Sequence, residues 1–155
     1  MKKYFFLPVI IPVILLCACN NNSSTGDNKK PPPTKADTLY EEVMDGHNVG
    51  MGKMGALTRA EQRVTQLIDS IEKLPAKARD MASPYKANLN NLLADLKNAE
   101  SSMDTWMKGF DLDSATNNTV ERVKYLLSQK EEVTKVKGVI LNSLQKADSV
   151  LKAKF

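Results

Sequence analysis

The sequence predicts an all-α protein, an elongated antiparallel bundle of three helices behind a lipidated, flexible tether. Apolar residues recur with the helical period along nearly the whole chain after residue 36. In this part of the chain no segment shows sustained apolar alternation, and clusters of β-branched residues are absent. The connections between the periodic segments are short, which favours antiparallel neighbours. A four-helix bundle is the alternative, in which the glycines between Gly46 and Gly55 break the first helix.

The first predicted helix runs from about Asp37, as N-cap, to Leu74, because Pro75 follows and disfavours helical conformation in the residue before it. At 1.5 Å per residue such a helix is roughly 55 Å long. Its predicted apolar stripe comprises Tyr40, Met44, His47, Met51, Met54, Thr58 and Glu61, with Leu57, Val64, Leu67, Ile68 and Ile71 beyond.

The second and third predicted helices have clear start signals. Ser83 as N-cap and Pro84 at the first helical position begin the second helix, and Gly109 lies near its end. Asn118 and Glu121 have the spacing of a capping box at the start of the third helix. The second stripe comprises Tyr85, Leu89, Leu92, Leu93, Leu96, Ala99, Met103, Trp106, Met107 and Phe110. The third comprises Val120, Val123, Leu127, Val133, Val136, Ile140, Leu144, Ala147 and Leu151.

The N-terminus has the pattern of an export signal. Lys2 and Lys3 precede a 13-residue apolar run over residues 4–16, which is too short for a membrane span of about 20 residues. The run ends in Leu16-Cys17-Ala18-Cys19, which resembles a bacterial lipobox. That resemblance implies a signal peptide over residues 1–18, cleavage before Cys19, and acylation of Cys19 by fatty acids such as palmitate. An ordinary signal peptide or a signal anchor is the alternative.

Removal of residues 1–18 changes the composition of the chain. The formal net charge falls from +4 to +2 because Lys2 and Lys3 leave. Such a small, well-mixed charge predicts no nucleic-acid binding. Residues 19–36 lack a core-forming pattern and predict a lipid-anchored tether, so the helical domain is expected over residues 37–155. Asn20 after the lipidated cysteine favours the outer membrane of a bacterial envelope, facing the periplasm.

Methionine and the sole histidine concentrate in two predicted helices. Met44, His47, Met51 and Met54 follow a 3-4-3 spacing that places them on one helical face, and Met103, Trp106 and Met107 do the same on the second helix. A hairpin centred near residue 79 brings Met51 opposite Met107, so the two groups are predicted to meet.

Three interpretations of these residues remain open at the sequence level. Thioethers and an imidazole suit Cu(I), and the indole face of Trp106 is a candidate for cation–π contact. Methionine also fills irregular gaps in helical cores, which needs no ligand. Haem ligation by methionine and histidine is the third interpretation. Without metal binding, no cofactor is expected.

Catalytic patterns are otherwise lacking, and we expect no enzyme. The single histidine has no Ser/His/Asp partners at plausible spacing. The segment Gly50-Met-Gly52-Lys-Met-Gly55 spells a dinucleotide fingerprint, but helical sequence rather than a strand precedes it.

The chain also resembles small lipoproteins of the Bacteroidota often labelled "viral A-type inclusion protein". The resemblance rests on Tyr40, Val43, Met44, His47, Met51, Met54, Met103, Trp106, Met107, Tyr125 and Leu126 and covers about residues 37–153. It departs at Gly46, Gly50 and Gly52, where acidic or larger residues are expected. It implies the location and the fold rather than an activity. The leading hypothesis is therefore a membrane-anchored, non-enzymatic envelope protein that binds a partner or has a structural role, and the rival is a soft-metal binder.

Overall fold

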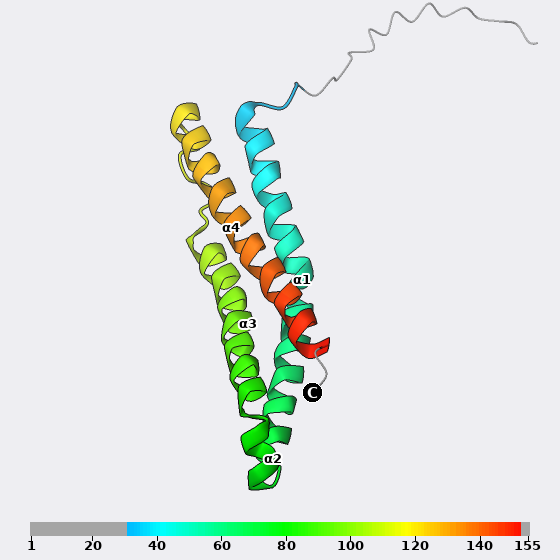
Figure 1. Cartoon of the computed structure of the whole chain (residues 1–155). Coiled ribbons are helices and arrows are strands. Elements are labelled where there is room, and N and C mark those ends of the chain that lie inside the picture. The colour runs from blue at the N-terminus through cyan, green and yellow to red at the C-terminus, as the bar shows by residue number, and fades with distance from the viewer. Residues whose placement is uncertain (1–30, 153–155) are drawn as a thin grey trace, which may run out of the picture. The chain divides into compact units, whose positions relative to one another are not determined.

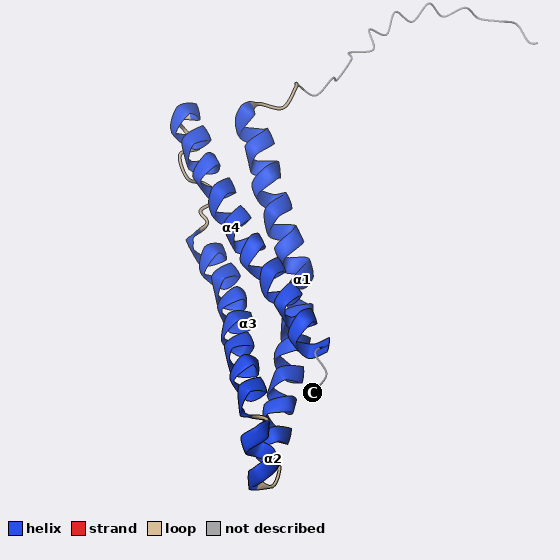
Figure 2. Cartoon of the chain, viewed as in Figure 1, coloured by secondary structure: helices blue, strands red, loops and turns tan. Residues whose placement is uncertain are grey.

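Four helices make up nearly all of the part of the chain that the computed structural model describes, residues 31–152 (Figure 1). They are α1 (Lys35–Glu72), α2 (Ala76–Met81), α3 (Ser83–Gly109) and α4 (Thr119–Lys152). Between residues 31 and 152 there is no strand (Figure 2), so the predicted all-α bundle is confirmed. The predicted signal peptide, the lipidation site Cys19 and most of the tether lie outside the described residues.

Helix α1 begins with a capping box made by Thr34 and Asp37. The Asp37 N–H donates to the Thr34 hydroxyl over 3.2 Å, and the Thr34 N–H donates to the Asp37 carboxylate over 2.8 Å. Asp37 is therefore the third helical residue, and its prediction as N-cap is wrong. The helix continues through all of its glycines for 38 residues, or about 57 Å, so the predicted alternative of a broken first helix is not realised.

The connection between α1 and α3 contains the short helix α2, which the sequence prediction missed. A single residue, Ala82, separates α2 from α3, and its φ of −83° and ψ of −3° are themselves helical. Ala82 occupies the N-cap position of α3 without a side-chain cap, so the prediction of Ser83 as N-cap is wrong. Pro84 lies in the first turn of α3, where its missing N–H costs no helical hydrogen bond.

The loop between α3 and α4 is fixed by side chains. The Asn118 amide oxygen accepts from the N–H groups of Val120 (3.1 Å) and Glu121 (3.2 Å), which is the N-cap half of the predicted capping box. The Asn118 N–H donates to the Ala115 carbonyl over 3.0 Å, in place of the predicted bond to Glu121. The Tyr125 hydroxyl accepts from the Asp111 N–H over 2.7 Å, and an Arg122 guanidinium N–H donates to the Ser114 carbonyl over 2.8 Å. These contacts tie the loop to the first two turns of α4.

The three long helices run in alternating directions, so α1 and α4 are parallel and α3 is antiparallel to both (Figure 1). Their buried apolar side chains form one continuous core. The core comprises Leu39, Val43, Leu57, Val64, Ile71, Leu89, Leu92, Leu96, Ala99, Met103, Trp106, Leu126, Val133, Ile140 and Ala147. Burial of this apolar surface is the main force that holds the bundle together.

The face that α1 turns to the core differs from the predicted one by a single residue. In its N-terminal half α1 buries Leu39, Val43, Gly46, Gly50 and Leu57, whereas the prediction centred on the residues that follow four of these. Glycine adds no apolar signal to the sequence pattern, although its lack of a side chain lets a neighbouring helix approach. The predicted residues Tyr40, Met44, His47 and Met54 are only partly buried, and Met51 is exposed.

The predicted stripe of α4 needs a smaller correction. Val120 is 75% exposed and Leu127 is 42% exposed, whereas Leu126 is fully buried in their place. The polar side chains of Gln129 and Ser143 are also buried, and the apolar pattern gave no sign of them. The predicted stripe of α3 is confirmed, since all of its residues are buried or partly buried.

Two glycines set the distance between the helices in this half of the bundle. A Cβ added at Gly46 would lie 2.9 Å from a methyl carbon of Val133 on α4. A Cβ added at Gly50 would overlap the terminal methyl of Met103 on α3. Gly46 and Gly50 therefore permit the close approach of α1 to both partners.

Candidate functional site

The imidazole of His47 and the thioether of Met107 meet between α1 and α3. His47 Nε2 lies 3.4 Å from Met107 Sδ, and both side chains are partly buried. On the other side of the ring, His47 Nδ1 lies 3.2 Å from the amide oxygen of Asn48. This oxygen accepts the imidazole proton in the tautomer that carries the proton on Nδ1. The lone pair of Nε2 then faces the sulfur, which is also a lone-pair donor.

An aromatic row extends from His47 across α3 to α4. The rings of His47 and Trp106 are tilted with centroids 5.6 Å apart, and Trp106 stacks on Phe110 at 5.0 Å. Phe110 stacks in turn on Tyr125 at 6.1 Å, and the Arg122 guanidinium carbon lies 6.0 Å from the Tyr125 ring centroid. Trp106 is 7% exposed, and its indole nitrogen is buried without a hydrogen-bond partner. The row therefore holds one edge of the His47–Met107 pair in place.

The predicted meeting of the methionine and histidine groups is confirmed, but with a different register. His47 lies against Met107, whereas the prediction placed Met51 there. The difference arises because the helical connection is centred nearer residue 77 than residue 79. Met51 is 39% exposed, one helical turn beyond His47.

The six predicted metal ligands differ in how deeply the structure buries them. Met103 is fully buried and points at Gly50 of α1, so it belongs to the core. Met44 and Met54 are partly buried on α1, and Met54 packs against the core. Within residues 31–152 no group of three or more His, Cys, Asp or Glu side chains could hold a metal ion. A metal site in this half of the bundle would therefore depend on sulfur together with His47.

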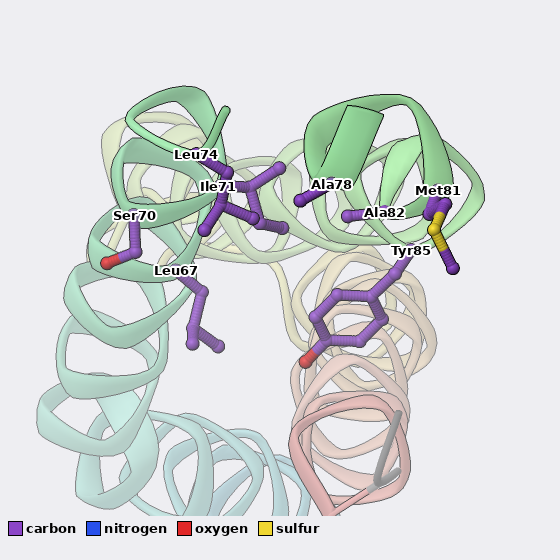
Figure 3. Close-up of a pocket in the computed structure, with 8 residues that line it drawn as sticks. All are labelled: Leu67, Ser70, Ile71, Leu74, Ala78, Met81, Ala82 and Tyr85. Carbon is purple, nitrogen blue, oxygen red and sulfur yellow. The ribbon is translucent and has the colours of Figure 1, made fainter. Parts of the chain in front are cut away.

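A second feature lies at the opposite end of the bundle, where an apolar groove of about 400 Å³ opens between α1 and the α2–α3 segment (Figure 3). It is lined by Leu67, Ser70, Ile71, Leu74, Ala78, Met81, Ala82 and Tyr85. The α1 side chains face those of α2 and α3 across it, and Met81 at its rim is 78% exposed. None of these lining residues comes from α4, although the Tyr85 hydroxyl donates to the Val150 carbonyl over 3.4 Å.

Basic residues are frequent in the segment that forms one side of this groove. Residues 73–82 contain three bases, Lys73, Lys77 and Arg79, and one acid, Asp80. The nearby Glu72 carboxylate is neutralised by Lys86 at 2.8 Å, and the Lys86 ammonium lowers the pKa of Glu72 by hydrogen bonding and by its charge. By contrast, residues 111–121 at the other end contain three acids and no base. The two segments therefore differ in net charge, although Arg122 directly follows the acidic one.

The groove was missed by the sequence prediction, which treated residues 75–82 as a turn. The signal that could have revealed it is the run of good helix formers between Pro75 and Pro84, in which Ala78 and Met81 are three positions apart and share a face. Asn48 was missed as well, because a polar residue next to a histidine has no distinctive spacing.

Comparison with known proteins leaves the function open. No protein-family model, curated protein or solved structure matches the chain. None of the described helices is both long enough and apolar enough to cross a membrane.

Proposed function

We propose that the chain is a lipid-anchored, non-enzymatic protein of a bacterial cell envelope that binds a partner protein through the groove between α1 and the α2–α3 segment. The observation that carries this proposal is the groove itself. It is open and almost entirely apolar, and it ends in an exposed methionine. An apolar groove between helices is one of the recurring sites at which the apolar face of a partner helix docks.

The shape and the charge of the groove define the partner. Two helices form its walls, which is the geometry that receives the apolar face of an amphipathic helix. The excess of basic residues between 73 and 82 favours acidic residues on the flanks of that helix. The proposed occupant is therefore an amphipathic helix of another protein, with large apolar side chains on one face and acidic residues beside them.

The anchor is proposed from the sequence. Leu16-Cys17-Ala18-Cys19 has the lipobox pattern, and a polar tether follows it. Each methylene of an acyl chain buried in lipid contributes about 0.8 kcal/mol, so the two or three chains of a bacterial lipoprotein hold it firmly. Asn20 supports the outer membrane, facing the periplasm, as the location.

Lipidation is tested by mass spectrometry of the mature N-terminus after expression in a bacterial host. We expect an acylated chain that begins at Cys19. Cys19→Ser abolishes acylation, whereas the matched variant Cys17→Ser retains it. An unmodified chain that begins before Cys19 contradicts the anchor, whatever the groove binds.

Partner binding is tested with two synthetic amphipathic helical peptides that share a leucine stripe and carry either glutamate or lysine beside it. We expect the glutamate peptide to bind the protein with an affinity that falls as salt is added, because salt screens the charge pairs. Ala78→Glu places a carboxylate in the groove and lowers this affinity by about tenfold or more, equivalent to 1.4 kcal/mol per decade. The matched control Leu112→Glu changes an exposed residue at the opposite end and leaves binding unchanged.

Other results contradict the proposal. Equal binding of the lysine peptide, or binding unchanged by Ala78→Glu, rejects the groove as an acidic-helix site. Concentration-dependent self-association that Ala78→Glu abolishes identifies a second copy of the chain as the occupant. Peptide binding that appears only after Phe155→Ala identifies the chain's own residues 153–155, which lie outside the described part, as the occupant.

A further inference from the structure

We infer that His47 and Met107 form a site for a soft monovalent cation, Cu(I), on the flank of the bundle between α1 and α3. This inference is independent of the proposed groove function and of the lipid anchor. It rests on the 3.4 Å contact between His47 Nε2 and Met107 Sδ.

The hydrogen bonding of His47 explains why this contact favours a cation. In the tautomer with the proton on Nδ1, Asn48 accepts that proton and Nε2 presents its lone pair to a sulfur that has no proton to donate. Two acceptors that face each other leave both unsatisfied, and a soft cation between them bonds to both. The second nitrogen of a metal-binding histidine is commonly held in this way by a hydrogen-bond acceptor, which orients the ring.

The geometry suits a metal ion without large movement. Bonds of about 2.0–2.3 Å to nitrogen and sulfur, as for the d¹⁰ ion Zn²⁺, give an angle of roughly 100° at the metal for donors this far apart. Thioether sulfur selects Cu(I) over harder cations such as Mg²⁺ and Ca²⁺.

Neighbouring side chains can complete the coordination. Met51 lies one helical turn after His47 and is exposed, and Met44 lies one turn before it. The flexible methionine side chain allows either sulfur to reach an ion held at His47. The ring of Trp106, whose centroid is 5.6 Å from that of His47, is a candidate for a cation–π contact with the ion.

The experiment is an anaerobic titration of the full-length chain with Cu(I) in detergent, against a chromogenic Cu(I) chelator. Cys17→Ser and Cys19→Ser are present throughout, so that thiols do not compete. We expect one equivalent of Cu(I) to bind and to quench the fluorescence of Trp106, the only tryptophan in the chain.

Matched variants locate the site. Met107→Leu and His47→Gln each weaken Cu(I) binding at least tenfold. The controls Met103→Leu in the core and Met81→Leu at the opposite end leave Cu(I) binding unchanged. Asn48→Ala weakens binding by about ten- to a hundredfold, the usual effect of losing such a supporting residue. Circular dichroism checks that each variant is folded, and Met107→Leu conserves volume well enough to be tolerated.

Three binding results overturn the inference, and one fluorescence result does so as well. The binding results are the absence of Cu(I) uptake by the parent protein, uptake by folded His47→Gln with unchanged affinity, and equal weakening by Met107→Leu and Met81→Leu. Quenching of Trp106 without a change in the chelator signal also rejects it, because Cu(I) would then not be bound.

Discussion

The two ends of the bundle are built in different ways. Where α3 passes into α4, the loop is fastened by Asn118, Tyr125 and Arg122, whose side chains bond to backbone groups. Where α1 passes into α3, the short helix α2 has no side-chain cap and no buried residue. Near the first end, glycines draw α1 against its neighbours, whereas at the second end α1 and α3 leave an apolar groove between them.

This difference shows where a metal site and where a docking site can arise in a simple bundle. Close packing beside Gly46 and Gly50 holds polar and sulfur-containing side chains in fixed mutual positions, which a metal site requires. Looser packing beside α2 exposes apolar surface, which a docking site requires. The predictions below test this contrast, beginning with the largest expected effect.

Truncation of a methionine should give the largest difference in unfolding free energy between the two ends. Met103→Ala removes a fully buried side chain and is expected to lower the free energy of unfolding by about 2–5 kcal/mol. Met81→Ala, at a residue that is 78% exposed, should change it by no more than about 0.5 kcal/mol. Urea unfolding followed by circular dichroism measures both. Similar losses for the two variants would contradict the contrast in packing.

Enlargement of a small residue should have opposite consequences at the two ends. Gly46→Leu forces a side chain against Val133 of α4 and is expected to destabilise the protein by about 1–3 kcal/mol. Ala78→Leu extends into the open groove and should have an effect within about 0.5 kcal/mol of zero. The same urea titration applies. Gly52→Ala serves as the control, since a Cβ there meets no atom within 4 Å. The higher helix propensity of alanine should raise the free energy of unfolding by about 1 kcal/mol.

Removal of a polar side chain at a helix start should also cost more stability at the α3–α4 end than at the α1–α3 end. Asn118→Ala removes the side-chain acceptor at the start of α4 and is expected to cost about 1 kcal/mol in unfolding free energy. Ser83→Ala, at the start of α3, should cost almost nothing, because the N-cap position belongs to Ala82. Thermal unfolding by calorimetry measures the pair. A larger loss for Ser83→Ala would show that this hydroxyl caps α3 in solution.

The smallest expected effects concern two carboxylates on α1. Burial raises the pKa of Glu61, repulsion by Glu100 raises it further, and Lys97 opposes them. Because the folded protein then holds this proton more tightly than the unfolded chain, the contribution of Glu61 to stability falls as the pH rises above the ordinary carboxyl range. Glu61→Gln should therefore raise the free energy of unfolding at pH 7 by a few tenths of a kcal/mol, and leave it nearly unchanged near pH 4.

Glu72 provides the control of opposite sign. Its pKa is lowered by Lys86, so its contribution is present at neutral pH and is lost as the pH falls through the lowered value. Glu72→Gln should reduce stability slightly at pH 7 and converge with the parent protein in acid. Urea unfolding at the two pH values distinguishes the two carboxylates, and equal signs at pH 7 would contradict their assignment.

Much of the fold could be predicted from local signals in the sequence. Asn118 is recognisable as a cap because its side chain acts on backbone groups two and three residues away. The stripe of α3 was predicted because leucine dominates it. The predicted core face of α1 was displaced by one residue because Gly46 and Gly50 are buried. Glycine has no side chain, so its burial does not appear in a pattern of apolar side chains.

The candidate site was predicted in composition but not in register. The clustering of His47 with methionines is visible in the sequence, and the structure confirms that His47 meets Met107. Which methionine faces the ring depends on the length of the connection, and the connection is helical rather than a turn. The groove is lined by residues of α1, α2 and α3 together, and such a combination has no local signal in the sequence.

The joint at Ala82 has a consequence for motion. Helix α2 buries none of its own residues, and one residue of helical backbone connects it to α3. Segments with so little buried surface open at a small fraction of the free energy needed to unfold the whole protein. Amide hydrogens of residues 76–81 should therefore exchange with solvent far faster than those of residues 89–103. The wall of the groove formed by α2 is thus able to adjust to an occupant while the rest of the bundle stays folded.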